Sequence, residues 1–293
     1  MLLHMNLEAV KSFAEVVTLE NGYEVLEIKT KAATAKIAFQ GATLFEWTPA
    51  GQSPVIFTSS KAIFKDDKAI RGGVPICWPW FGPHPTDADK PQHGFVRNTK
   101  WSLKAVEKFG KEVKVMFQLP FDTHEHIEGA FALSVIFTIG AELTVELVSK
   151  NIGDVPLEVG GALHTYFTVG DITKTRVQGL DQVDYLDKPD GGAQKTQTGD
   201  IIVGEEVDRV YLDTTADCTV VDEAQSRQIT VSKENSATTV VWNPWKEKAQ
   251  ALADMGDDEY KNFVCVETVN TGEDTVTLKP GATHSLIQSI RVS

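Results

Sequence analysis

The chain has 293 residues, of which 42% are hydrophobic and 24% are charged, so it can form a sizeable core and is not expected to be disordered. Its net charge of −13 disfavours duplex nucleic acid or an anionic membrane as a partner, because both attract basic surfaces. No apolar run approaches the ~20 residues of a membrane helix, and the first residues lack the cationic start of a signal peptide. The three widely spaced cysteines (Cys77, Cys218 and Cys265) suit reduced thiols, so we expect a soluble, cytoplasmic protein.

Alternation of apolar and polar residues predicts β-strands through most of the chain. Residues 13–28 are typical of a hairpin that turns at Asn21-Gly22. Further strands are predicted at 113–119, 133–139, 143–147, 238–242, 263–269, 275–278 and 285–292. Strands with one polar face indicate antiparallel sheets packed as a large β-sandwich. We find no linker or internal repeat, so we expect residues 1–293 to form a single domain.

Signals for helices are few. Asn6 could begin a short amphipathic turn near the start of the chain. Asn243-Pro244 is a stronger signal, because Asn is a good N-cap and Pro fits the first helical position. The helix that begins there should end near Gly256 and lead into the strand FVCVETV.

The least ordinary segment is Arg71–Asn98, which contains five prolines and four glycines. Such a segment cannot form a regular strand, and long loops of compact domains often bind ligands. It is either a rigid cover over a sheet edge or a ligand-binding loop, and we favour the second. Arg71 and Arg97 could clamp an anion with their planar guanidinium groups. Three aromatic side chains of the loop could stack on the face of a sugar: Trp78, Trp80 and Phe81.

Two polar residues, His164 and Glu267, lie in strand-like segments. Each could be either a catalytic group or an ordinary structural or solvated side chain. His164, in the apolar run 160–167, has the position of a hydrogen-bonded core histidine. Glu267 shares a strand face with Cys265, and is either solvated or placed there to react. His124 and His126 have the spacing of metal ligands, but no third ligand is evident nearby, so an acidic surface loop is the better interpretation. No nucleotide-binding, hydrolase or zinc-protease motif occurs.

Three segments resemble the aldose 1-epimerase (galactose mutarotase-like) superfamily, and most closely its hexose-6-phosphate mutarotase branch. They are RGGVPICWPWFGPHP with QHGFVRN, then ALHTYF, and finally NPWKEKAQALADMGDDEYKNFVCVETVN. The resemblance covers most of the chain and implies a large antiparallel β-sandwich, in agreement with the strand pattern. It also implies an isomerase that interconverts the α- and β-anomers of a sugar.

The resemblance places the catalytic acid at His164 and the catalytic base at Glu267. Glu267 would remove the proton of the C1 hydroxyl, while His164, as an imidazolium, would protonate the ring oxygen. The ring would open to the aldehyde and close on its other face, with the two roles reversed. This chemistry needs no cofactor and no metal.

The resemblance assigns substrate binding to four residues: Arg71, Gln92, Arg97 and Asp208. Asp213 lies close to Asp208 and leaves the choice between the two aspartates open. His93 is a plausible contact for a sugar hydroxyl. Two arginines in a chain of net charge −13 favour a phosphorylated sugar, so the expected partner is a hexose 6-phosphate and the expected state is a monomer.

Three alternatives remain. The chain could be an aldose 1-epimerase that acts on unphosphorylated hexoses, or a non-catalytic carbohydrate-binding protein on the same sandwich. A metal-dependent β-sandwich enzyme would need a cluster of histidine ligands that the sequence does not provide. If the first interpretation holds, His164 and Glu267 should face one pocket at a separation of about a sugar ring. Arg71 and Arg97 should lie at one end of that pocket.

Overall fold

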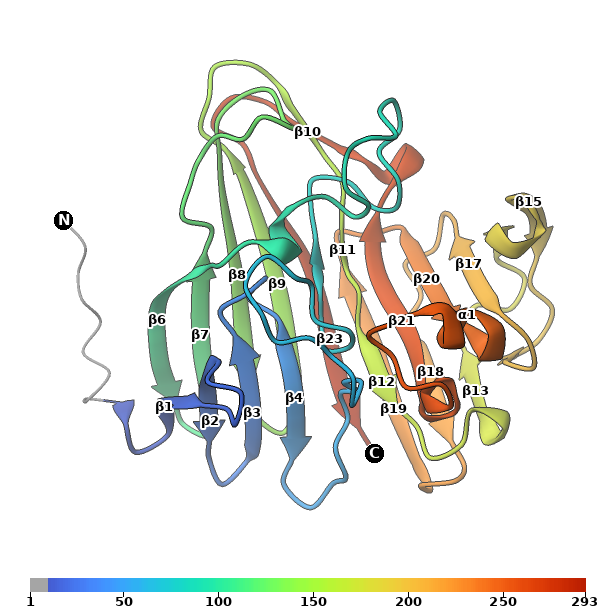
Figure 1. Cartoon of the computed structure of the whole chain (residues 1–293). Helices are drawn as coiled ribbons and strands as arrows, with labels where there is room; N and C mark the ends of the chain where they lie inside the picture. Colours follow the sequence, from blue (N-terminus) through green and yellow to red (C-terminus); the bar gives the residue numbers. More distant parts are fainter. Residues whose placement is uncertain (1–9) are drawn as a thin grey trace.

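The computed structural model describes residues 10–293 and consists mainly of antiparallel β-sheets (Figure 1). The largest sheet has nine strands, which pair in the order β16 (Ile201–Ile202), β13 (Thr175–Gln178), β18 (Cys218–Asp222), β19 (Arg227–Glu234), β23 (Thr283–Val292), β9 (Leu143–Asn151), β8 (Phe131–Ile139), β7 (Glu112–Gln118) and β6 (Ser102–Phe109). A four-stranded sheet follows the chain as β1 (Ala14–Thr18), β2 (Glu24–Lys29), β3 (Ala33–Ala38) and β4 (Leu44–Pro49).

An eight-stranded sheet completes the sandwich. Its strands pair in the order β15 (Ala193–Thr196), β14 (Asp184–Asp187), β17 (Val207–Tyr211), β20 (Thr238–Asn243), β21 (Phe263–Asn270), β11 (Gly161–Leu163) and β5 (Ile76–Cys77), and β12 (Tyr166–Thr168) also pairs with β21. A two-stranded sheet joins β10 (Leu157–Val159) to β22 (Val276–Leu278).

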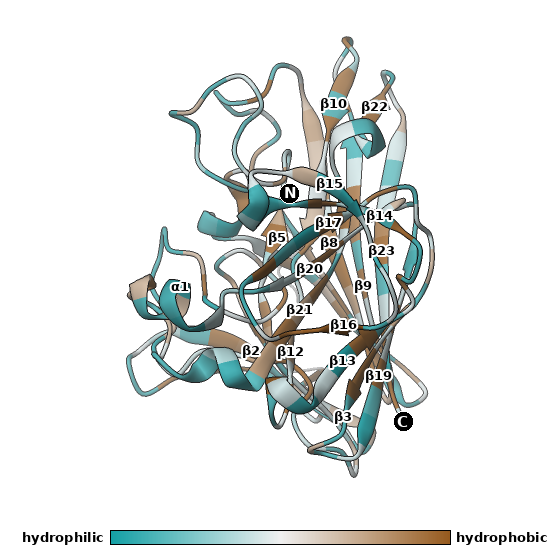
Figure 2. Ribbon diagram, turned by 90° about the vertical axis from the view of Figure 1, so that its right-hand side faces the viewer, coloured by the Kyte–Doolittle hydropathy of each residue, from teal (hydrophilic) through white to brown (hydrophobic). Residues whose placement is uncertain are grey.

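One face of the nine-stranded sheet packs against both other large sheets, and Figure 1 shows β1–β4 lying in front of β6–β9. On β7, Val113, Val115 and Phe117 are fully buried in this core, while Lys114 faces away from it. Figure 2 shows the same division, with hydrophobic strands inside and hydrophilic loops around them. The predicted large antiparallel β-sandwich is therefore confirmed.

The predicted hairpin at the start of the chain is present as β1 and β2. Its loop is closed by a hydrogen bond from Leu19 N to Tyr23 O of 2.8 Å, and Gly22 adopts a φ of +84° that favours glycine. The side chain of Asn21 accepts a hydrogen bond from Tyr23 N at 3.1 Å. The expected turn at Asn6 lies outside the described residues.

The predicted helix is present as α1 (Trp245–Ala251), but it begins one residue later than expected, with Pro244 and not Asn243 as its N-cap; Asn243 Oδ1 accepts a hydrogen bond from Trp245 N at 2.8 Å. The predicted end near Gly256 is wrong, because Leu252 is already extended and the chain then turns to bury Met255. Short 3-10 helices occur at η2 (Val96–Asn98), η3 (Ile172–Lys174), η4 (Lys188–Asp190), η5 (Glu259–Asn262) and η6 (Gly272–Asp274). None of the helices described between residues 10 and 293 is long and apolar enough to cross a membrane.

The outer face of the eight-stranded sheet, which points away from the nine-stranded sheet, carries a second apolar cluster. Its members include Trp242 on β20, Cys265 on β21 and Ala249 on α1, so the helix covers this face. The Arg71–Asn98 segment also reaches it through Cys77, which pairs with Ala162 of β11. This covered face is where His164 and Glu267 lie.

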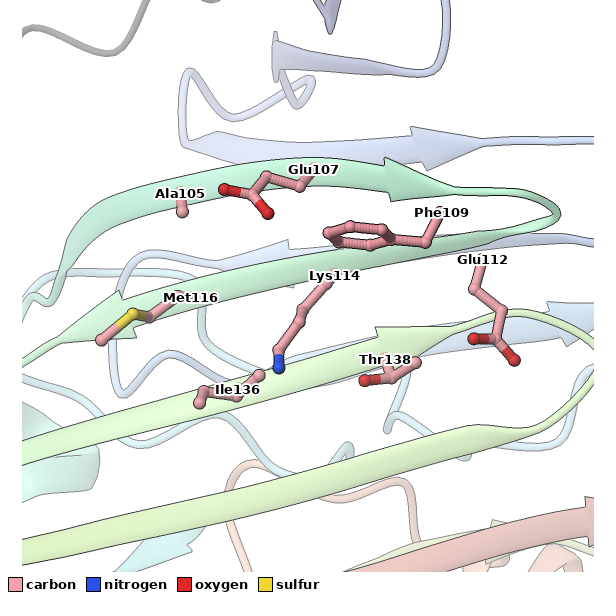
Figure 3. A pocket seen from close by; sticks show the side chains of 8 residues that line it. All are labelled: Ala105, Glu107, Phe109, Glu112, Lys114, Met116, Ile136 and Thr138. Carbon is pink, nitrogen blue, oxygen red and sulfur yellow. The ribbon is translucent and has the colours of Figure 1, made fainter.

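A hollow of about 530 Å³ lies elsewhere, on the outer face of the nine-stranded sheet (Figure 3). It is lined by Ala105, Glu107, Phe109, Glu112, Lys114, Met116, Ile136 and Thr138. These residues all come from β6, β7 and β8 of the nine-stranded sheet, whereas His164 lies at the eight-stranded sheet. The hollow holds no buried group without a hydrogen-bond partner, and the site described below is independent of it.

Candidate active site

His164 and Glu267 lie opposite each other on adjacent strands. Leu163 pairs with Thr268 and Tyr166 pairs with Cys265, so the intervening register places His164 beside Glu267. Their atoms Nδ1 and Oε1 are 3.4 Å apart, and the residues are 8% and 1% exposed. The expected separation of a sugar ring is wrong. A direct contact still suits the chemistry, because the two oxygens that exchange protons in anomerisation are bonded to the same carbon, C1.

The backbone at His164 leaves the regular ladder of the sheet. β11 ends at Leu163 and β12 begins at Tyr166. Between them, His164 N donates to the carbonyl of Pro75 at 3.1 Å and Thr165 N donates to the carbonyl of Leu163 at 3.0 Å. The Arg71–Asn98 loop therefore holds the strand at the residue that carries the imidazole.

The pair is buried without the hydrogen bonds that usually accompany burial. Among the described residues, no group hydrogen-bonds to Nδ1 of His164 or to either carboxylate oxygen of Glu267. Burial raises the pKa of Glu267 well above its usual value. Burial also lowers the pKa of His164 well below its usual value, and His93, Arg97 and Arg71 add to that effect. The free site thus favours a carboxylic acid beside a neutral imidazole, and not the imidazolium expected from the sequence.

Arg71 is attached to the pair through Tyr166. Its Nη1 donates to the hydroxyl of Tyr166 at 3.3 Å, and its Nε pairs with Asp254 Oδ1 at 3.1 Å. The Tyr166 ring lies parallel to the imidazole of His164, with 5.1 Å between centroids and 13° between planes. The guanidinium is therefore held in a fixed direction next to the imidazole. Neither Tyr166 nor Asp254 was predicted as a site residue.

Arg97 approaches the pair from the other end of the loop. Its Nη2 donates to the carbonyl of Gln92 at 3.0 Å, while its Nε is buried and has no hydrogen-bond partner among residues 10–293. The side chain of Gln92 is exposed, and Gln92 contacts Arg97 through its backbone carbonyl. The ring of His93 lies 5.7 Å from that of His164, and burial lowers the pKa of His93 to about 3. His93 is therefore a neutral hydrogen-bonding group.

The aromatic residues of the loop divide between core and site. Trp78 is 1% exposed and donates from Nε1 to Ser149 Oγ at 3.0 Å, so it cannot stack on a sugar as we expected. Trp80 is also buried, at 8% exposure. Phe81 is half-buried, with its ring 6.5 Å from that of His164. The sequence did not indicate Trp242, whose ring lies edge-on to His164 at 5.9 Å.

The structure separates the two candidate aspartates. Asp208 pairs with Trp242 on β20, which in turn pairs with Cys265 on β21, so Asp208 points to the same face as Glu267. Burial raises its pKa, and Lys248 Nζ lies 4.0 Å away. Asp213 follows the end of β17 and is exposed. Geometry therefore favours Asp208 as the aspartate of the site.

The pair has one further neighbour that could bind a metal. A nitrogen of His164, Sγ of Cys265 and a carboxylate oxygen of Glu267 lie within 4.8 Å of one another, which is a donor set that zinc accepts. Burial raises the pKa of the Cys265 thiol well above its usual value, so this ligand is held protonated. The nearby guanidiniums of Arg71 and Arg97 also oppose a cation. Both features disfavour a cation at this cluster.

His124 and His126 do not form a metal site with any third ligand in the part of the chain that is described. The ring of His124 stacks on Phe95, with centroids 3.7 Å apart and planes within 7°. Its Nδ1 accepts a hydrogen bond from His126 N at 3.2 Å. These histidines therefore pack beneath the Arg71–Asn98 loop, and the expectation of a plain acidic surface loop was incomplete.

Comparisons with known proteins identify the family of the chain. The family model described as Aldose 1-epimerase matches residues 24–291. A protein of Escherichia coli (strain K12) named "Putative glucose-6-phosphate 1-epimerase" is 40% identical over 88% of this chain and 87% of its own length. A protein of Cenchrus ciliaris with the same name is 37% identical, over 92% of this chain and 84% of its own.

Solved structures show the same fold. The crystal structure of "a putative mutarotase (YeaD)" from Salmonella typhimurium superposes with a TM-score of 0.87 at 31% identity, over 98% of this chain and 99% of that one. A galactose mutarotase-like protein from Clostridium acetobutylicum, at 15% identity, has a TM-score of 0.75 over 96% of this chain and 98% of its own. From the family match and the two relatives, the chain belongs to the aldose 1-epimerase family.

Proposed function

We propose that this isomerase is a hexose-6-phosphate 1-epimerase that interconverts the α- and β-anomers of glucose 6-phosphate. The observation that carries the proposal is the buried pair of His164 and Glu267, in contact at 3.4 Å and with unused hydrogen-bonding atoms, beside Arg71 and Arg97. The names of the relatives from Escherichia coli and Cenchrus ciliaris support the phosphorylated substrate.

In the proposed reaction the pair moves one proton in each direction. The carboxylate of Glu267 takes the proton of the C1 hydroxyl, and the imidazolium of His164 gives its proton to the ring oxygen as the bond from C1 to that oxygen breaks. The product of this step is the open-chain aldehyde, with a carboxylic acid at Glu267 and a neutral imidazole at His164. Rotation about C1–C2 followed by the reverse transfers closes the ring as the other anomer.

The free site favours a carboxylic acid at Glu267 and a neutral imidazole at His164. In the proposed reaction this is the protonation state after the ring has opened. Before opening, the proton has to move from Glu267 to His164, and their atoms Nδ1 and Oε1, 3.4 Å apart, have to come closer to form the hydrogen bond that carries it. The positive charges of Arg71 and Arg97 oppose this transfer, because they lower the pKa of His164. A bound phosphate dianion offsets those charges, and so the substrate itself favours the reactive ion pair.

The other residues of the site take supporting roles in this proposal. Arg71 and Arg97 bind the phosphate through charge-assisted hydrogen bonds, with Gln92 holding the loop at Arg97. His93 and Asp208 bind sugar hydroxyls. Burial raises the pKa of Asp208, and its carboxyl oxygens can accept hydrogen bonds from the sugar.

We further propose that the protein is a cytoplasmic monomer with one domain over residues 1–293. Its three cysteines are unpaired and buried, as in proteins of reducing compartments. Core residues from Ala14 to Ile290 belong to one apolar cluster, which supports one domain. The net charge of −13 argues against a nucleic-acid or membrane partner.

The direct test is the rate at which the anomers exchange, measured by exchange NMR on the anomeric protons. We expect the enzyme to accelerate exchange of glucose 6-phosphate much more than that of glucose at equal concentration. Equal acceleration of both sugars would favour an aldose 1-epimerase for unphosphorylated hexoses. Binding of glucose 6-phosphate without acceleration would favour a carbohydrate-binding protein.

A second test concerns Asp254, which directs the guanidinium of Arg71. Replacing Asp254 with Ala should raise KM for glucose 6-phosphate about tenfold with little change in kcat, because a hydrogen bond to a charged group contributes about 1.5–3 kcal/mol. The matched control is Asp257→Ala, which removes an exposed partner of Lys61 and should leave both constants unchanged. Equal effects of the two variants would show that Asp254 does not direct Arg71.

A further inference from the structure

Gln288 is a fully buried amide on β23, in the apolar layer between the two large sheets. Both N–H donors of its side chain and its carbonyl oxygen form hydrogen bonds. Its Oε1 accepts a hydrogen bond from Thr165 Oγ1. Its Nε2 donates to Thr268 Oγ1 at 3.0 Å and to the carbonyl of Val266 at 3.2 Å.

The partners of this amide flank the two residues of the pair. Thr165 follows His164 in the break between β11 and β12, while Val266 and Thr268 stand on either side of Glu267 on β21. Because side chains alternate along a strand, Thr165 and Thr268 point into the sandwich where His164 and Glu267 point outward. One side chain of the opposite sheet is therefore bonded to both strands directly behind the pair.

The position of this amide coincides with the break in the ladder. His164 N and Thr165 N donate to Pro75 and Leu163 instead of to β21, so fewer backbone bonds hold the two strands together at this point. The link that remains in the backbone runs from Val266 N to Thr165 O at 3.3 Å, and Gln288 adds its side-chain bonds on both sides of it. Burial of an amide in an apolar layer is costly, and here its three bonds offset that cost.

We propose that Gln288 is a positioning residue that fixes the distance and direction between the imidazole of His164 and the carboxyl of Glu267. The inference rests on the proposed function, because it assigns Gln288 a role in that reaction. Gln288 lies on the opposite side of the sheet from the substrate, so it acts on the rate through the strands and not through binding.

The first experiment replaces Gln288 with Leu, which has a similar size but cannot form these bonds. We expect kcat to fall by about 10–100-fold, since misplacement of reacting groups by about 1 Å costs this much. KM for glucose 6-phosphate should change by no more than about twofold, because Gln288 lies on the opposite side of the sheet from the substrate and does not bind it. An unchanged kcat would overturn the proposal.

Asn151→Leu is the matched control for loss of a buried amide. Asn151 is 1% exposed, and its Nδ2 donates to the carbonyls of Val155 and Leu278 at 2.7 and 2.8 Å, remote from the pair. Both variants should lower the melting temperature, but only Gln288→Leu should lower kcat. Equal losses of kcat in the two variants would assign Gln288 a structural role alone.

A double-mutant cycle with Thr165→Val tests the link itself. Thr165→Val removes the hydroxyl that donates to Gln288, and the double variant leaves no orphaned partner between these two positions. The effects on kcat should be less than additive, whereas additive effects would contradict a shared role. If Gln288→Leu does not fold, Thr268→Val replaces it in the experiment. This variant removes the hydroxyl that accepts a hydrogen bond from Gln288 Nε2, and the same fall in kcat is expected.

A measurement without substrate separates this proposal from the proposed function. The ring nitrogens of His164 can be followed by nitrogen-15 NMR, and Gln288→Leu should shift their resonances while Asn151→Leu should not. If the wild-type protein accelerates neither sugar, the proposed function fails whatever this spectrum shows. If the wild-type protein is active and the His164 resonances do not move in Gln288→Leu, the positioning role fails alone.

Discussion

Glu267→Gln lowers kcat for the anomer exchange of glucose 6-phosphate by about 10²–10⁴-fold, as expected when one positioned proton transfer is lost. The amide is nearly the same size as the carboxyl group but cannot take a proton from the C1 hydroxyl. Glu267 makes no hydrogen bond that the change would break among the described residues, and its charge is costly to bury, so the fold should be retained. His164→Ala should have an effect of the same order. Exchange NMR gives the rate, and circular dichroism gives the folded fraction.

The control for this prediction is Glu158→Gln. Glu158 is an exposed glutamate on β10, far from the pair in the fold, so its loss should leave kcat unchanged. Near-normal exchange by Glu267→Gln or His164→Ala, with an intact fold, would reject the assignment of the acid and the base.

Arg97→Ala is expected to raise KM for glucose 6-phosphate by about 100-fold, which corresponds to two lost hydrogen bonds to a charged group at about 1.5 kcal/mol each. The reason is that this guanidinium has hydrogen-bond donors left for a ligand. Its Nε is buried without a partner in the described part of the chain, and only its Nη2 is engaged, by Gln92. KM for unphosphorylated glucose should change by about threefold or less, because that sugar has no charged group for Arg97 to bind.

The comparison of two sugars makes the second prediction specific. Arg291→Ala, at an exposed position of β23, serves as the control for loss of positive charge in an acidic protein. A similar rise in KM for both sugars would remove the phosphate-binding role of Arg97. In that case the site would suit an enzyme for unphosphorylated hexoses.

Much of the fold could be predicted from alternation alone. On β7 and β8 the apolar positions predicted from the sequence, such as Val113 and Leu133, are fully buried, because one face of an antiparallel sheet has to be covered. Alternation could not show how the strands divide among sheets. Nor could it show that Trp78 belongs to the core, since a tryptophan in a proline-rich loop fits a core or a ligand equally well.

Family resemblance supplied the main residues of the candidate site, but contacts between distant segments could not be predicted from the sequence. Sequence alternation placed Glu267 and Cys265 on one face but could not show that this face is buried by α1. Asp254 meets Arg71 only because the helix ends at Ala251, five residues before the predicted end, and the chain then turns back. The protonation of the pair was missed for the same reason, because it follows from burial and from the charges around His164.

The residues of the site come from two kinds of structure. Glu267 belongs to β21 and His164 to the short break between β11 and β12 beside it, whereas Arg71, His93 and Arg97 all come from the long segment between β4 and β6, which also contains β5. Evolution can therefore alter that segment to accept a different sugar while the reactive pair stays as it is. In the proposed function, the two phosphate-binding arginines and the reactive pair would thus lie in separate stretches of the chain, while Asp208 on β17 belongs to the same sheet as Glu267.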